Sequence, residues 1–150
     1  MHATLCFLGW RPVAEVEAIA EACQTLADER RLELALGAAL WLPPRRPGVL
    51  AVGLEDPGHR LRALQSRLSR TLAAGGWYAP ERRPFLAHIT VARIGPAAAR
   101  AGFRPFALPT PGSMGFSASE LTLFRSRPGG VGSRYERLAL VRLPTPSGQS

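Results

Sequence analysis

Apolar residues follow two different periods along this chain, and each period predicts one kind of element. Residues 32–42 and 48–54 are nearly continuous apolar runs joined by the turn-forming sequence PPRRP, which predicts two neighbouring strands. Four leucines, at positions 61, 64, 68 and 72, recur at helical spacing instead. Because Asp56 and Pro57 are typical of a helix start and two glycines at 75–76 of a helix stop, we predict a helix between them.

The rest of the chain continues this mixture of strands and helices. Runs of alternating or continuous apolar residues, bounded by glycine and proline, mark the other elements. In chain order the further predicted elements are a strand at 3–8, a helix opened by Pro12 and ending near Arg31, a strand at 86–94, a Pro- and Gly-rich connection with room for a short helix, a strand at 116–125, the turn RPGGVG and a return strand at 134–143.

Length and composition favour one domain. With 150 residues, of which 46% are hydrophobic, the chain can bury a single sizeable core. We expect one domain over residues 1–143 and a disordered polar tail over 144–150. There is no signal-peptide pattern and no apolar run of membrane-spanning length, so we expect a cytoplasmic protein with no membrane partner. Cys6 and Cys23 are expected to be buried free thiols.

Charge is distributed unevenly. The formal net charge is +8, and all 19 basic residues are arginine. Residues 1–56 carry five arginines and eight acidic residues, a balance of −3, whereas residues 57–150 carry fourteen arginines and three acidic residues, a balance of +11. The second part therefore suits a polyanion, either nucleic acid or a phosphorylated small molecule; a solvated basic surface is the alternative.

The sequence His-x-Thr followed by an apolar run occurs twice, in MHATLCFLGW at the start and in FLAHITVARI at 85–94. Side chains two apart on a strand share a face, so His2 and Thr4 project together, as do His88 and Thr90. Each motif is followed by helical or connecting sequence and further strands, which suggests two related lobes. If the lobes pack with these faces opposed, two imidazoles and two hydroxyls line one cleft.

Two imidazoles can act as a general acid and a general base near neutral pH, as cleavage of a phosphodiester requires, and threonine hydroxyls can donate hydrogen bonds to phosphate oxygens. A single His-x-Thr on a strand is more often a core histidine; the repeat favours catalysis. A metal site is disfavoured, because the only other histidine is His59 and neither motif has metal-ligand spacing. We expect no metal and no cofactor.

The paired motifs resemble those of the two-histidine (2H) phosphoesterase superfamily. HATLCFLG and RRPFLAHITVAR are similar to its RNA 2′,3′-cyclic phosphodiesterase branch, also called the 2′-5′ RNA ligase or LigT family, as are RRPGVLAVGL and the C-terminal hairpin LTLFRSRPGGVGSRYERLALVRLP. The resemblance implies an α+β fold, with two βαβ-like lobes and largely antiparallel sheets around a central cleft. It further implies hydrolysis of a terminal 2′,3′-cyclic phosphate on RNA to a 2′-phosphate, and some members join tRNA halves through a 2′-5′ linkage.

By position, the resemblance makes His2 and His88 the acid–base pair and Thr4 and Thr90 the phosphate-binding hydroxyls. We expect His2 to be the acid and His88 the base, although the reverse assignment is open. Arg93 matches an arginine that often closes the second motif. Strict alternation puts Arg93 on the face opposite His88, so that a bulge or strand end is needed to bring it to the site; pairing with an acid is the alternative role.

The resemblance also leaves a difference and several alternatives. Relatives carry a strand, a helix and the start of another strand before the first motif, so the resemblance implies a domain truncated at its N-terminus and less stable than an extended one. We expect a monomer whose partner is RNA with 2′,3′-cyclic phosphate ends, such as tRNA fragments. A non-catalytic RNA-binding module and a 2H esterase acting on a small cyclic phosphate remain alternatives.

Overall fold

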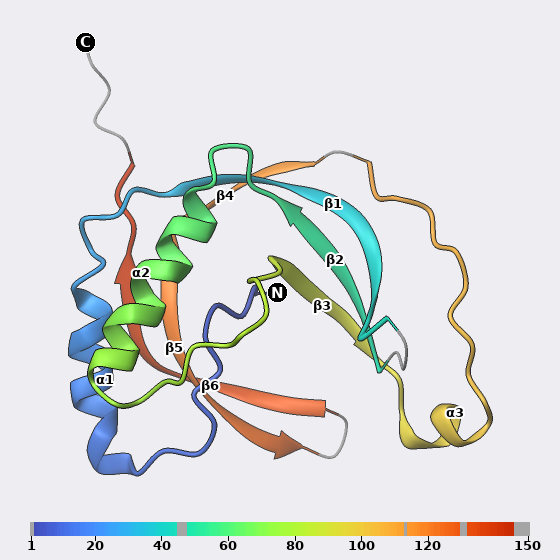
Figure 1. Cartoon of the computed structure of the whole chain (residues 1–150), viewed down its shortest axis with the longest axis horizontal. Helices are drawn as coiled ribbons and strands as arrows, with labels where there is room; N and C mark the ends of the chain where they lie inside the picture. Colours follow the sequence, from blue (N-terminus) through green and yellow to red (C-terminus); the bar gives the residue numbers. More distant parts are fainter. Residues whose placement is uncertain (1, 45–47, 113, 130–131, 146–150) are drawn as a thin grey trace.

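Within the residues that the computed structural model describes, 2–44, 48–112, 114–129 and 132–145, a four-stranded sheet forms the largest part of the fold (Figure 1). Its strands are β1 (Leu32–Leu42), β2 (Val49–Glu55), β3 (His88–Arg93) and β4 (Gly115–Ala118), in the order β3-β2-β1-β4. A separate ribbon pairs β5 (Glu120–Gly129) with β6 (Gly132–Arg142). All these pairings are antiparallel, which confirms the α+β class.

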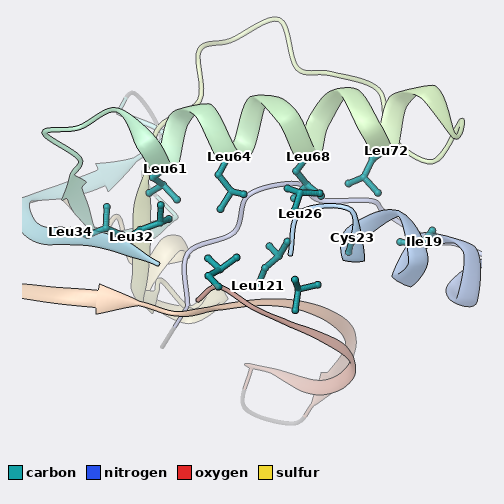
Figure 2. Close-up of a cluster of buried hydrophobic side chains, with 12 residues drawn as sticks. Ile19, Cys23, Leu26, Leu32, Leu34, Leu61, Leu64, Leu68, Leu72 and Leu121 are labelled. Atoms are coloured by element: carbon teal, nitrogen blue, oxygen red, sulfur yellow. The ribbon is translucent and has the colours of Figure 1, made fainter. Parts of the chain in front are cut away.

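Two of the helices, α1 (Val16–Gln24) and α2 (Arg60–Ala74), contribute buried residues to the core. The others are a short 3-10 turn (Val13–Glu15) and α3 (Pro96–Arg100). The predicted leucine stripe of α2 is confirmed, because all four leucines are buried and face the core (Figure 2). The buried cluster consists of Ile19, Cys23, Leu26, Leu32, Leu34, Leu61, Leu64, Leu68, Leu72, Leu121, Val141 and Leu143.

The first helix is shorter than the sequence predicts. It ends at Gln24 instead of near Arg31, and the chain continues in tight turns. Arg67 of α2 explains why these turns are stable: its guanidinium donates to the carbonyl of Thr25 at 2.7 Å and pairs with Asp28 and Glu29 at 2.9 Å. In a longer helix the carbonyl of Thr25 would accept a bond within the helix, and the two carboxylates would not be held together at Arg67.

The prediction of a strand at residues 3–8 is wrong. Within the described part of this segment only Ala3 makes a ladder contact, an isolated antiparallel bridge to Ile89, and the following residues are irregular. Leu5, Cys6 and Leu8 all pack against the core, whereas Phe7 is 74% exposed. This burial does not alternate, because the segment packs through side chains on the core instead of pairing along β3.

The predicted strand at 116–125 is two strands in two different sheets. β4 pairs with β1, and β5 pairs with β6, so the chain crosses between sheets at Ser119. The carbonyl of Ser119 accepts a hydrogen bond from the amide of Leu143 at 2.8 Å, which holds the crossing point. The apolar pattern runs through both strands, since each of them faces the same core.

Other predictions about the chain are tested in part. Residues 45–47 of the PPRRP turn, 130–131 of the hairpin turn and 146–150 of the tail lie outside the described residues. No helix within the described ranges is long and apolar enough to span a membrane.

Both cysteines are free thiols. Burial raises the pKa of Cys23 and raises the pKa of Cys6 to about 11.

Helix α2 begins three residues later than Asp56 and Pro57 suggest, yet Asp56 still caps it. The residue before the helix is His59, which has a left-handed φ of 54°. The Asp56 carboxylate accepts hydrogen bonds from the backbone amides of Arg60 at 2.9 Å and Arg62 at 3.1 Å. These bonds satisfy two amides that have no partner within the helix.

Replacing Asp56 by alanine is therefore expected to lower the free energy of unfolding by about 0.5–2 kcal/mol, since two amides of α2 lose their acceptor. Urea denaturation followed by circular dichroism measures this change. Asp56→Asn is the matched control, because its side-chain oxygen can still accept one bond. Equal stability of the alanine variant and the parent would show that water replaces the carboxylate without loss.

Candidate active site

The bridge between Ala3 and Ile89 brings the two His-x-Thr motifs together. β3 is the edge strand of the sheet, and Ala3 pairs with its open edge in an antiparallel register. His2 and Thr4 are the chain neighbours of Ala3, and His88 and Thr90 are those of Ile89, so this single bridge brings both motifs to the same edge. The motifs thus lie side by side at one edge of the sheet.

His88 is held by its own backbone neighbourhood. It is the first residue of β3, half-buried, and lies opposite Gly53 of β2. Its Nδ1 atom is 2.8 Å from the carbonyl oxygen of Leu86. Because a carbonyl can only accept, this hydrogen bond places a proton on Nδ1 and leaves Nε2 free to exchange a proton with a substrate or water.

His2 is oriented by aromatic side chains of the ribbon. Its ring centroid lies 4.7 Å from that of Tyr135 in an edge contact and 5.6 Å from that of Phe124. Partial burial lowers the pKa of His2, since desolvation disfavours the charged imidazolium. A lower pKa makes the protonated ring a stronger acid, although a smaller share of molecules is protonated at neutral pH.

A pH titration of the ring protons by NMR is expected to show His2 losing its proton below the ordinary pKa of about 6.5. Phe124→Ala uncovers the ring and should raise this pKa toward the ordinary value. Phe106→Ala is the matched control, because Phe106 contacts Trp41 and not His2. A parent His2 that titrates at or above about 6.5 would contradict the effect of burial.

Arg93 lies on the same face of β3 as Thr90 because of a bulge. Ala51 pairs with Thr90 and Val49 pairs with Arg93, while the register shifts between them and leaves Val91 as the extra residue of β3. Opposite residues share a face, and Val49 and Ala51 are two apart on β2, so Thr90 and Arg93 also share a face. The structure therefore contains the bulge that is needed to bring Arg93 to this face.

A large cavity of about 1730 Å³ lies between the N-terminal segment, β3 and the ribbon. His2, Thr4 and Arg93 line it together with Phe124 and Tyr135. His88 and Thr90 are outside this lining and join the group through the bridge between the motifs. The sequence analysis did not predict Phe124 as a site residue. A signal for it is present, because the predicted hairpin has one aromatic residue on each strand, Phe124 before the turn and Tyr135 after it.

Among the aromatic residues Phe7, Trp41, Trp77, Tyr78, Phe85 and Tyr135, the structure sets Tyr135 beside a motif histidine. Tyr135 is 46% exposed. Trp77, Tyr78 and Phe85 pack against the core, Trp41 packs against Phe103 and Phe106, and Phe7 is exposed on the irregular N-terminal segment.

The third histidine takes no part in this group. His59 lines a separate cavity of about 330 Å³ with Asp56, Arg62 and Leu86. Within the ranges that the structure describes, no three His, Cys, Asp or Glu side chains gather as metal ligands would. Two imidazoles, two hydroxyls and a guanidinium are instead groups that can hold a phosphate and move protons around it.

No protein-family model matches the chain. The chain is 34% identical over 94 residues to the RNA 2′,3′-cyclic phosphodiesterase of Aeropyrum pernix, a match that covers 62% of this chain and 52% of that protein. The matched part thus spans about half the length of this curated relative.

Three solved structures are similar to the whole chain. TT0787 of Thermus thermophilus has a TM-score of 0.78 and 24% identity, covering 96% of this chain and 78% of its own, and shows the fold alone. A structure described as a phosphoesterase has a TM-score of 0.78 and 25% identity, with 96% and 77% covered. E. coli LigT in complex with 3′-AMP has a TM-score of 0.77 and 26% identity, with 95% and 76% covered.

The arrangement of sheet, ribbon and helices is the LigT-like α+β fold. With its two His-x-Thr motifs side by side at one sheet edge, the chain is similar in sequence to a cyclic phosphodiesterase and in structure to LigT.

Proposed function

We propose that this chain hydrolyses the terminal 2′,3′-cyclic phosphate of RNA to a 2′-phosphate, with His2 and His88 as acid and base and without a metal ion. The observation that carries the proposal is the bridge between Ala3 and Ile89, which brings the two His-x-Thr motifs together. The name of the Aeropyrum relative supports RNA with a cyclic phosphate as the substrate, and the 3′-AMP complex of LigT supports a nucleotide ligand.

In the proposed reaction His88 is the base. Its Nε2 atom takes a proton from water, because Nδ1 is already bonded to the carbonyl of Leu86. The water oxygen forms a new bond to phosphorus while the bond between phosphorus and the 3′-oxygen breaks. Protonated His2 donates its proton to that leaving oxygen, so one water is added overall and a 2′-phosphate remains.

The other residues bind the phosphate in this proposal. The hydroxyls of Thr4 and Thr90 donate hydrogen bonds to the non-bridging oxygens, where negative charge increases in the transition state. Arg93 supplies a permanent positive charge from the same face of β3 as Thr90. If the 5′-hydroxyl of a second RNA replaces water, the same bond changes produce a 2′-5′ linkage, so ligation of tRNA halves requires no additional group.

The test is incubation of the protein, in the presence of EDTA, with a short RNA that ends in a 2′,3′-cyclic phosphate. We expect complete conversion to the 2′-phosphate, identified by chromatography against synthetic RNAs that end in a 2′-phosphate or a 3′-phosphate. A 3′-phosphate product would mean that the bond between phosphorus and the 2′-oxygen breaks instead, which would contradict the proposal. Loss of activity in EDTA that returns with a divalent metal would contradict the metal-free mechanism.

Two controls separate the alternatives. A cyclic mononucleotide tests the small-substrate esterase: turnover of the mononucleotide at a rate equal to that of RNA would favour that function. Binding of the same RNA, measured by fluorescence anisotropy, tests the non-catalytic module: tight binding without any conversion by folded protein would favour that function over the phosphodiesterase.

A further inference from the structure

The outer half of the ribbon is a second positively charged feature next to the candidate site. We define the outer ribbon as residues 124–127 of β5 and 134–137 of β6. In Figure 1 the inner half of the ribbon runs beside α1 and α2, whereas the outer half turns away from both helices. A bulge in β6 lies at this turn, where the register shifts between Leu123 and Phe124.

Two arginines of the outer ribbon share one carboxylate, and a third arginine lies opposite one of them. Arg125 lies opposite Glu136, and Arg127 lies opposite Arg134. Arg125 Nη1 and Arg127 Nε are both 3.5 Å from the same oxygen of Glu136, a long distance for an ion pair. Like charges directly opposite each other destabilise a strand pair, and one carboxylate does not balance three guanidinium groups, so this face keeps an excess of positive charge.

Two of the four arginines of α2, Arg60 and Arg67, provide the contrast. Arg60 donates to the backbone carbonyls of Arg30 and Arg31, and Arg67 is bound to Asp28, Glu29 and the carbonyl of Thr25. These two side chains hold the segment between α1 and β1 and are committed to the fold. Unlike these two side chains, the arginines of the outer ribbon line or adjoin the cavity that holds His2, so the outer ribbon is a candidate for the polyanion surface that the charge distribution predicts.

The position of the arginines decides which phosphates they can bind. Alternation along β5 sets Arg125 and Arg127 on the face opposite Phe124, the residue that contacts His2. They line the same cavity as His2 nonetheless. Because Phe124 and Tyr135, and not these arginines, contact His2, Arg125 and Arg127 are placed for phosphates farther along a strand that leaves the site.

Their spacing also fits a polymer. Residues two apart on a strand repeat every ~6.8 Å, which is similar to the separation of successive phosphates in an extended single strand of nucleic acid. Guanidinium groups bind phosphate oxygens in pairs of hydrogen bonds, and such contacts depend little on base sequence. The surface therefore fits the backbone of a single-stranded RNA better than a lone mononucleotide.

We propose that Arg125, Arg127 and Arg134 bind the backbone phosphates of the RNA strand that precedes the cyclic end. This inference rests on the proposed function for the position of that end at His2. It adds that the substrate is an RNA strand of several nucleotides, and that the outer ribbon determines the preference for RNA over a small cyclic phosphate.

The experiment compares the parent with Arg125→Gln/Arg127→Gln/Arg134→Gln and with the matched control Arg100→Gln/Arg104→Gln/Arg142→Gln, which removes three exposed arginines outside the cavity lining. Substrates are an RNA decamer with a 2′,3′-cyclic end and the corresponding cyclic mononucleotide. For the ribbon variant we expect about tenfold lower kcat/KM on the decamer through KM, and a slope of log affinity against log salt shallower by about 2. Turnover of the mononucleotide should equal that of the parent, and the control should behave as the parent does.

Anisotropy with a decamer that ends in a 3′-hydroxyl separates this inference from the proposed function. If the parent hydrolyses no cyclic phosphate but the ribbon variant still binds the decamer more weakly than the control, the RNA surface is supported while the reaction is not. Equal affinity of the ribbon variant, the control and the parent overturns the inference, even if hydrolysis is found. A fall in mononucleotide turnover equal to the fall with the decamer also overturns it.

Discussion

His88→Ala is expected to lower kcat/KM for the cyclic phosphate by about 10²–10⁴-fold, the usual contribution of one general acid or base. The ring of His88 carries the Nε2 atom that takes the proton from water in the proposed reaction, and alanine has no group that replaces it. The fold should be retained, because His88 is a half-buried residue at the start of an edge strand. Rates measured on the cyclic RNA, together with the thermal midpoint, check both parts.

His59→Asn is the matched control for a lost histidine. His59 lies before α2 with a positive φ, which asparagine tolerates, and it lines a different cavity from His2. The rate of the His59→Asn variant on the cyclic RNA should equal that of the parent. A folded His88→Ala variant with a parent-like rate would falsify the two-histidine mechanism, and an equal loss in His59→Asn would indicate a general effect on folding.

Leu26→Ala is expected to lower the free energy of unfolding by about 2–5 kcal/mol. The side chain of Leu26 is 0% exposed and lies beneath the leucines of α2 (Figure 2). Leu64 and Leu68 line the large cavity, whereas Leu26 is absent from its lining, so its methyl groups are surrounded by packed neighbours. Truncation therefore loses both the burial of the side chain and the contacts around it.

Urea unfolding of Leu26→Ala and of Leu86→Ala measures this effect against a matched truncation at a site that is 49% exposed. The control should lose less than about 1 kcal/mol, since much of its surface is already in water. Similar losses in both variants would show that the segment after α1 is not part of the cooperative core.

Elements with a strong local pattern were predicted well. β1 has the predicted bounds, and α2 ends at its two glycines with the leucine stripe toward the core. Helical and strand periods are local properties of the chain, so a single sequence is enough to read them. The N-terminal segment was predicted wrongly because its apolar run only indicates that the segment is buried. Its apolar residues pack against the core, but they have no neighbouring strand to form the hydrogen-bonded ladder that a strand requires.

The geometry of the candidate site depends on contacts between distant segments. The bulge at Val91 that brings Arg93 to the face of Thr90 exists only because β2 continues in register on both sides of it. Likewise, Phe124 and Tyr135 become neighbours of His2 through the packing of the ribbon against the N-terminal segment. Neither arrangement follows from the alternation of one strand, since partner and register belong to a different part of the chain.

The sequence by itself determined the chemical groups of this protein, two pairs of a histidine and a threonine that are two residues apart, because spacing along the chain is a local property. It also determined the excess of arginine in the second part. Only the tertiary structure decided that motifs 86 residues apart share one sheet edge, and which arginines hold the fold or remain in excess on the ribbon. These outcomes depend on pairing and packing across the chain, which no local pattern encodes.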